Sequence, residues 1–327
     1  MEVNVMSAPH VPVMLDQVLA RLAPAVSKPG AVAVDATLGA GGHTEALLTA
    51  HPGLTVLGLD RDPAALDHAT ERLRRFGNRF VPVRAVYDRI GEILTEHGHR
   101  AADGVLFDLG VSSMQLDRPE RGFAYAQDSS LDMRMDPEDE LTAETVVNTY
   151  DTADLVRLLR EYGEEKFAPR IARAIVRSRG EARITSSRML AELVREAIPA
   201  PARRTGGHPA KRTFQALRIE VNAELDTWAA ALPAALDALA PGGRVVVLSY
   251  HSLEDRITKR ELVRRTKSTT PAGLPVDLPG TEPQYRLLTR KAQQPTQTEL
   301  DRNPRSAPAR LRAAERLAPP TREGGDS

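Results

Sequence analysis

The chain has 327 residues, of which 41% are hydrophobic and 27% charged, so it can form two domains that each bury a core. It lacks a signal peptide and any apolar run of the ~18 residues that a membrane helix needs, so we expect a cytoplasmic protein with no membrane partner. Its lack of cysteine excludes disulfides, thiolate metal sites and a cysteine nucleophile, and we predict no metal site.

The formal net charge is zero, but the charges are segregated along the chain. Residues 128–165 include twelve acidic and three basic side chains, whereas residues 166–218 include thirteen basic and three acidic ones. A basic stripe, more than the total charge, is the electrostatic mark of a nucleic-acid-binding surface. Charge alone is equally compatible with two solvated helices that neutralise each other.

A helix is predicted after Pro12, and it is followed by a buried strand, a glycine turn and a second helix. The strand contains Val32 and Val34 and ends at Asp35, the turn contains Gly39, Gly41 and Gly42, and residues 44–48 have helical spacing. This arrangement is typical of the nucleotide-facing corner of a doubly wound α/β domain, where ligands bind outside the carboxyl ends of the strands.

Two further predicted strands, 55–60 and 104–108, also end in an acidic residue, Asp60 and Asp108. The glycine spacing lacks the last glycine of the dinucleotide fingerprint, which disfavours NAD. It suits S-adenosylmethionine, whose ribose diol Asp60 can bind through both carboxylate oxygens. The alternative is an ordinary turn with a solvated Asp.

A helix over 63–76 leads to a strand over 80–86 that ends at Tyr87. The Tyr87 ring either stacks on an adenine or packs at the rim.

From about residue 118 the pattern changes to helices with no intervening strand. They are predicted over 142–149, 152–162, 169–179 and 186–197. We therefore expect an α/β domain formed by residues 1–116 and 212–327, interrupted by an all-helical domain over 117–211.

The α/β pattern returns in the last third of the chain. Helices are predicted over 214–224 and 227–239, a buried strand over 243–248, and a polar run over 249–256. A loop over 266–283 and an edge strand over 285–289 follow. The basic, proline-interrupted tail 303–312 is expected to be disordered or to be ordered by a phosphate partner.

These segments resemble, along almost the whole chain, the RsmH (MraW) family of bacterial 16S rRNA methyltransferases. The blocks that carry the resemblance are His10–Val13, Asp35–His43, Phe107–Ser113, Leu131–Asp136, Arg212–Ile219, Ser249–Arg256 and Asn303–Ser306. The resemblance implies a Rossmann-like class I S-adenosylmethionine-dependent methyltransferase fold, with a mostly parallel seven-stranded sheet and an inserted all-helical domain that reads the substrate. It implies methylation of the N4 of a decoding-centre cytidine, with 16S rRNA in the small ribosomal subunit as partner. A homodimer is left open.

The resemblance also implies the cofactor-binding residues, which are Gly41, Gly42, His43, Asp60, Tyr87, Asp108 and Gln115. The chain departs from the family's expected phenylalanine at Tyr250. A DNA cytosine-N4 methyltransferase and a small-molecule N-methyltransferase are the alternatives.

The chemistry requires help from the protein, because the exocyclic amine of cytosine is a poor nucleophile that must be held and aimed. The chain lacks the Pro-Pro-aromatic motif of familiar amino-methyltransferases. Our catalytic candidates are Asp108 beside the amine, with Ser112, Ser113 and Ser249 completing the contacts and His251 as proton acceptor. For His251, a hydrogen bond to the backbone is the favoured interpretation.

We expect contacts to RNA phosphates from the arginines at 170, 173, 177, 203, 204 and 212. The target base of this RNA is expected to be unpaired or flipped.

Overall fold

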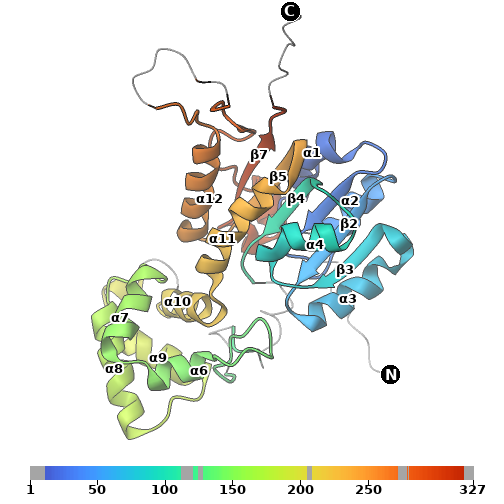
Figure 1. Ribbon diagram of the computed structural model, residues 1–327. Coiled ribbons are helices and arrows are strands. Elements are labelled where there is room, and N and C mark those ends of the chain that lie inside the picture. The colour runs from blue at the N-terminus through green and yellow to red at the C-terminus, as the bar shows by residue number, and fades with distance from the viewer. Residues whose placement is uncertain are drawn as a thin grey trace, which may run out of the picture. The chain divides into compact units, whose positions relative to one another are not determined.

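The computed structural model describes residues 12–111, 121–123, 128–204, 208–271, 278 and 280–319. The chain divides into two compact units (Figure 1). The first, here called the sheet unit, comprises residues 1–110 and 227–327, and the second, the helical unit, comprises residues 111–226. Among the described residues, no helix is both long enough and apolar enough to cross a membrane.

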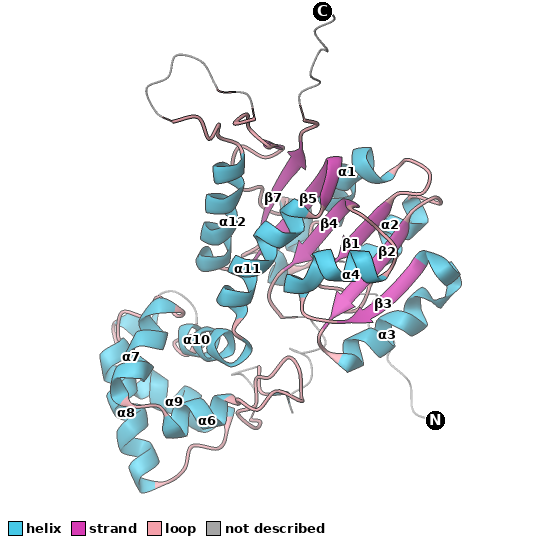
Figure 2. Cartoon of the chain, in the orientation of Figure 1, coloured by secondary structure: helices cyan, strands magenta, loops and turns pink. Residues whose placement is uncertain are grey.

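The sheet unit is built on one seven-stranded sheet with the strand order β3-β2-β1-β4-β5-β7-β6. Its strands are β1 (Val32–Asp35), β2 (Thr55–Asp60), β3 (Phe80–Arg84), β4 (Ala102–Asp108), β5 (Leu239–Ser249), β6 (Tyr285–Leu287) and β7 (Arg310–Arg316). β7 runs antiparallel to both of its neighbours, and the other pairs are parallel (Figure 2). This confirms the predicted Rossmann-like class I methyltransferase fold.

Helices cover both faces of this sheet. They are α1 (Leu15–Val26), α2 (Gly42–Ala50), α3 (Pro63–Leu73), α4 (Ile90–Glu96), α12 (Ser252–Arg265), the short α13 (Gln297–Arg302) and most of α11 (Glu224–Asp237). Successive strand residues serve opposite faces, so Leu106 packs in the core beside α1 and α2, and Phe107 packs with Trp228 in the core beneath α4 and α11. Two buried cores therefore hold the sheet rigid at its carboxyl edge.

The prediction for the basic tail is wrong. Residues 310–316 form β7, which lies beside β5 (Figure 1), and the strand order places β6 on its other side. Leu311 and Ala313 are completely buried. Leu311 and Ala313 point to one face of the sheet and Arg310 and Arg312 to the other, which is the period of a strand. On that second face Arg312 is mostly buried in an ion pair with Asp255. The expected edge strand near residue 285 is confirmed as β6.

The helical unit contains α6 (Ala143–Thr149), α7 (Thr152–Glu161), α8 (Ala168–Glu181), α9 (Ser187–Ala197) and α10 (Lys211–Asn222), and no named strand among its described residues (Figure 2). The side chains of Thr142, Asp151 and Ser186 accept hydrogen bonds from backbone amides in the first turns of α6, α7 and α9. These caps explain why the helices begin close to where the sequence predicts.

The helical unit extends further along the chain than the predicted 117–211. Phe214, Leu217 and Val221 on α10 belong to the same core as Leu158 on α7 and Ile171 on α8. The unit therefore ends after Asp226. The spacing of apolar residues indicates which face of a helix is apolar. It does not indicate which core that face packs against.

Candidate active site

Three carboxylates follow neighbouring parallel strands at one edge of the sheet. Asp35, Asp60 and Asp108 are the last residues of β1, β2 and β4, and β1 lies between the other two. Because parallel strands end at the same edge, the structure brings together the three acidic strand ends that the sequence predicts.

Asp35 stabilises the turn between β1 and α2 through buried hydrogen bonds. Its side chain is buried; Oδ2 accepts a hydrogen bond of 2.7 Å from Oγ1 of Thr44, and Oδ1 accepts one of 3.4 Å from the backbone N–H of Thr37. Burial raises the pKa of the Asp35 carboxyl, against the lowering effects of the Thr44 hydrogen bond and the nearby His43. Asp35 therefore fastens the start of α2 to the end of β1.

Asp60 holds the glycine turn in place. Its Oδ2 accepts a hydrogen bond of 2.9 Å from the N–H of Gly39, and its Oδ1 accepts one of 2.9 Å from the N–H of Asp62. Burial raises the pKa of the Asp60 carboxyl, while these two backbone donors lower it. The side chain is only partly buried, so the carboxylate lies where the turn meets solvent.

The turn itself needs glycine. Gly41 has a φ of 75°, which disfavours any residue with a Cβ, and a Cβ at this position would lie 3.1 Å from Cδ1 of Leu73. A Cβ on Gly42, the first residue of α2, would come within 2.5 Å of Cγ of Pro12. The path of the turn between β1 and α2 therefore depends on glycine at both positions.

Asp108 is partly accessible to solvent and has defined partners. Its Oδ1 accepts a hydrogen bond of 2.6 Å from the hydroxyl of Tyr250, its Oδ2 lies 3.6 Å from Nδ1 of His43, and its side chain is 25% exposed. Its backbone N–H donates to Oγ1 of Thr37 at 2.6 Å. A carboxylate fixed from two sides yet open to solvent can accept hydrogen bonds from an amine.

His43 and Tyr87, which the resemblance assigns to the cofactor, both contact neighbouring protein groups. The His43 ring is buried, with Nε2 3.0 Å from the carbonyl oxygen of Val13 and Nδ1 facing Asp108, so the ring supports Asp108 and offers little surface to a ligand. Tyr87 does not end β3 but starts a short 3₁₀ turn, and its ring makes edge contacts with Phe107 at 5.8 Å and Trp228 at 6.4 Å. Tyr87 is therefore a rim residue of the core, and stacking on an adenine stays a prediction.

Two catalytic candidates lie near the end of β5, Ser249 as its last residue and His251 just before α12. Ser249 is completely buried, and its Oγ has no hydrogen-bond partner among the described residues, so it is not presented to a substrate. His251 caps α12, because its Nδ1 accepts from the N–H of Glu254 at 3.4 Å while the Glu254 carboxylate accepts from the N–H of His251 at 3.2 Å. This is the backbone-bonded role favoured from sequence. His10, Ser112, Ser113 and Gln115 lie outside the described residues.

The helical unit carries a row of unpaired cations on α8. Arg170, Arg173 and Arg177 are exposed, and within the described parts of the chain none of them has an ion-pair partner. By contrast, the guanidinium of Arg203 donates to the carbonyl of Ile198 at 2.7 Å. Arg212 likewise donates to the carbonyl of Glu164 at 3.1 Å. The predicted set of six arginines therefore contains three that are available to phosphates and two that brace the fold, and the side chain of Arg204 lies outside the described part.

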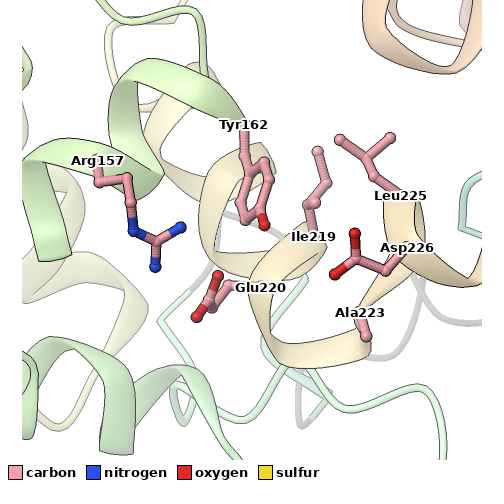
Figure 3. A pocket seen from close by; sticks show the side chains of 7 residues that line it. All are labelled: Arg157, Tyr162, Ile219, Glu220, Ala223, Leu225 and Asp226. Carbon is pink, nitrogen blue, oxygen red and sulfur yellow. The ribbon is translucent and has the colours of Figure 1, made fainter. Parts of the chain in front are cut away.

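A pocket of about 260 Å³ also lies in the helical unit, where Figure 3 shows Glu220 and Asp226 facing the Tyr162 side chain. It contains none of the predicted site residues. Burial, Glu220 and Asp226 raise the pKa of the Tyr162 hydroxyl. Oε1 of Glu220 also accepts a hydrogen bond of 2.9 Å from the hydroxyl of Tyr150. The lining also includes Arg157, so the pocket combines two carboxylates with one guanidinium and differs in charge from the arginine row.

The family of the chain follows from comparison with known protein families. The model of the MraW methylase family matches residues 7–317. The chain belongs to the MraW methylase family. The match covers both units, so the helical unit is part of the family's architecture and not an addition to it.

Members of this family with high similarity are proteins named ribosomal RNA small subunit methyltransferase H. The one from Salinispora tropica is 63% identical over 95% of this chain and 85% of its own length. The one from Thermobifida fusca is 60% identical over 95% of this chain and 94% of its own length. Among solved structures, an rRNA methylase from Streptococcus thermophilus has a TM-score of 0.42 at 13% identity, over 95% of this chain and 100% of that one. That likeness is too weak to carry an argument.

Proposed function

We propose that this methylase transfers a methyl group from S-adenosylmethionine to the exocyclic N4 of a cytidine in the decoding centre of 16S rRNA. The observation that carries the proposal is the Asp108 carboxylate, fixed by Tyr250 and still 25% exposed, at the end of the strand beside the glycine turn. The names of the highly similar relatives add the small-subunit rRNA as substrate.

The residues at the carboxyl edge fit S-adenosylmethionine. The turn depends on Gly41, where a Cβ would press against Leu73 of α3, and the half-buried Asp60 carboxylate retains lone pairs for a ribose diol besides the two that its backbone donors use. Tyr87 and Gln115 complete the proposed set, at the adenine and near the methyl end. When bound, this cofactor supplies an electrophilic methyl group.

Asp108 would act on the nucleophile. The amine of cytosine has its lone pair delocalised into the ring, and a carboxylate that accepts a hydrogen bond from an N4 proton holds the nitrogen in a more reactive geometry. Positioning and electrostatics of this kind supply most of the rate in such reactions. The Asp108–His43 contact gives the carboxylate a fixed orientation before substrate arrives. Ser112 and Ser113 stay proposed second contacts to the amine.

The arginine row supports RNA as the substrate. Arg170, Arg173 and Arg177 recur at three- and four-residue intervals and so lie along one side of α8. Exposed guanidinium groups without protein partners are suited to phosphates. Since duplex RNA hides N4 in base pairing, the target is expected to be unpaired or flipped out. We place the activity in the cytoplasm, on the small ribosomal subunit, and leave a homodimer as an open prediction.

The test is methyl transfer with mapping of the product. The protein is incubated with labelled S-adenosylmethionine and small subunits from a strain that lacks this gene, and the modified nucleotide is located by mass spectrometry. The proposal predicts one N4-methylated cytidine in 16S rRNA of the decoding centre. Label in DNA, in a small molecule alone, or at another atom of the RNA would contradict it and favour the corresponding alternative.

A further inference from the structure

Tyr250 follows β5 and contacts the Asp108 carboxylate from a position 142 residues away in the chain. Its hydroxyl donates a hydrogen bond of 2.6 Å to Oδ1 of Asp108. We propose that Tyr250 is a positioning residue for methyl transfer, whose hydroxyl binds Oδ1 and, together with His43 beside Oδ2, fixes the orientation of the Asp108 carboxylate that meets the substrate amine. The inference rests on the proposed function and adds a residue that acts through Asp108.

The Tyr250 backbone is fixed by the cap of α12. Oε2 of Glu254 accepts a hydrogen bond of 2.7 Å from the N–H of Tyr250 and one of 3.2 Å from the N–H of His251. The side chain of Glu254 is itself buried. The connection between β5 and α12 is therefore held at two successive residues, which leaves the tyrosine little freedom to swing away from Asp108.

The Tyr250 ring is placed by a glycine. Gly110 has a φ of 96°, and a Cβ on it would lie 3.4 Å from Cδ2 of Tyr250, so the ring packs closely over the backbone that follows Asp108. The ring also packs against the core that includes Leu248 and Leu311. Ring packing and the hydroxyl contact are separable, because phenylalanine retains the first and loses the second.

The charged groups around this contact favour a neutral, donating tyrosine. Burial, and then the negative charge of Asp108, raise the pKa of the Tyr250 hydroxyl well above its usual value, and Glu254 and Glu299 add to this. On the other side of Asp108 stand His43, 3.6 Å from Oδ2, and the buried Asp35. The hydroxyl thus stays protonated, and it stabilises the ionised form of the carboxylate that it contacts.

The test compares Tyr250→Phe with Tyr285→Phe in the full-length protein. Tyr285 is a suitable control because its buried hydroxyl donates to the carbonyl of Leu236, in the same unit but away from Asp108. Each variant is measured for kcat and KM across pH, for affinity for S-adenosylmethionine, and for melting temperature.

For Tyr250→Phe we expect kcat to fall about tenfold and the acid limb of the kcat profile to move up by about one pH unit, since a hydrogen bond to an ionised group is worth roughly that factor. Donor affinity should stay within about twofold and the profile of Tyr285→Phe should not move. An unchanged kcat and acid limb in Tyr250→Phe would overturn the inference. So would a loss of activity matched by losses of donor affinity and melting temperature, because that marks a structural role. A wild-type protein without methyl transfer would instead refute the proposed function.

Discussion

The hydroxyl of Thr44 donates a hydrogen bond of 2.7 Å to Oδ2 of Asp35, which joins the first turn of α2 to the end of β1 across the glycine turn. Asp35 is only 1% exposed. The Asp35 carboxylate therefore accepts its hydrogen bonds from the glycine turn and α2, and not from a ligand. The site thus has an inner acid that shapes the turn and two outer acids, Asp60 and Asp108, that remain near solvent.

The burial of Asp35 predicts a particular pH dependence for Asp35→Asn. Because the folded-state pKa of Asp35 is raised above its ordinary 3.8, the group's stabilising contribution is complete below that value and is lost as pH rises through the folded pKa. The asparagine variant avoids this loss. Its free energy of unfolding relative to wild type should therefore increase as pH rises from 4.5 to 7.5.

Urea unfolding at the two pH values measures this difference. The matched control is Asp67→Asn on the exposed side of α3, for which the difference from wild type should stay flat. A relative stability of Asp35→Asn that falls as pH rises would mean that the Asp35 charge is stabilised in the folded protein, contrary to our account.

Gly41→Ala tests the turn. The left-handed backbone at Gly41 and the 3.1 Å approach to Leu73 should cost about 1–2 kcal/mol of stability, and affinity for S-adenosylmethionine should fall at least about fivefold. Gly91→Ala is the control, because Gly91 lies in α4 with no heavy atom within 4 Å of the added Cβ. That variant should be as stable as wild type or up to about 1 kcal/mol more stable. Equal donor affinity in both variants would contradict a ligand-facing turn.

Truncation tests the role of the last strand. A chain that ends after Asn303 lacks β7, so β5 and β6 lose their shared partner and the buried Leu311 is absent. We expect loss of cooperative unfolding, seen by calorimetry or circular dichroism. A chain that ends after Pro319 keeps β7 and should melt within about 2 °C of the full-length protein. A shorter chain that still unfolds cooperatively would show that β7 is dispensable.

The arginine row predicts the salt dependence of RNA binding. Replacing Arg170, Arg173 and Arg177 by alanine should reduce the slope of log K against log salt by about 2, because each phosphate contact on single-stranded RNA contributes ~0.7. The control removes three exposed arginines of the sheet unit, Arg74, Arg89 and Arg264. Each of these is paired with a neighbouring glutamate at 3.8, 2.8 and 2.6 Å. Equal slopes for the two triple variants, measured by filter binding, would reject α8 as the phosphate-contacting surface.

Sequence patterns predicted the strand ends well for a physical reason. A buried parallel strand is an uninterrupted run of β-branched and aliphatic residues, so a carboxylate such as Asp35, Asp60 or Asp108 marks the point where the run leaves the core. Sequence patterns gave a wrong prediction where the structure of a segment depends on pairing with residues far away in the chain. The period-two alternation around Leu311 was present, but the prolines and arginines nearby suggested a disordered tail.

The contacts of the site were harder to predict than its position. Nothing local to Tyr250 indicates that its hydroxyl reaches Asp108, because that contact depends on β4 and β5 being neighbours in the sheet. The buried state of Ser249 follows in the same way from its pairing with Arg310 on β7, a strand that the sequence analysis did not expect. Long-range strand pairing therefore decides which of the candidate residues are buried and which are exposed.

The most direct test of the account is a calorimetric titration of S-adenosylmethionine into the wild-type protein and into Asp60→Ala and Asp67→Asn. We predict one bound donor per chain in the wild type and in Asp67→Asn. Affinity should be at least about tenfold lower in Asp60→Ala, which loses both the proposed ribose acceptor and the carboxylate that holds Gly39. No detectable binding to the wild-type protein, or equal affinity in all three, would contradict a methyl-donor site at the carboxyl edge of this sheet.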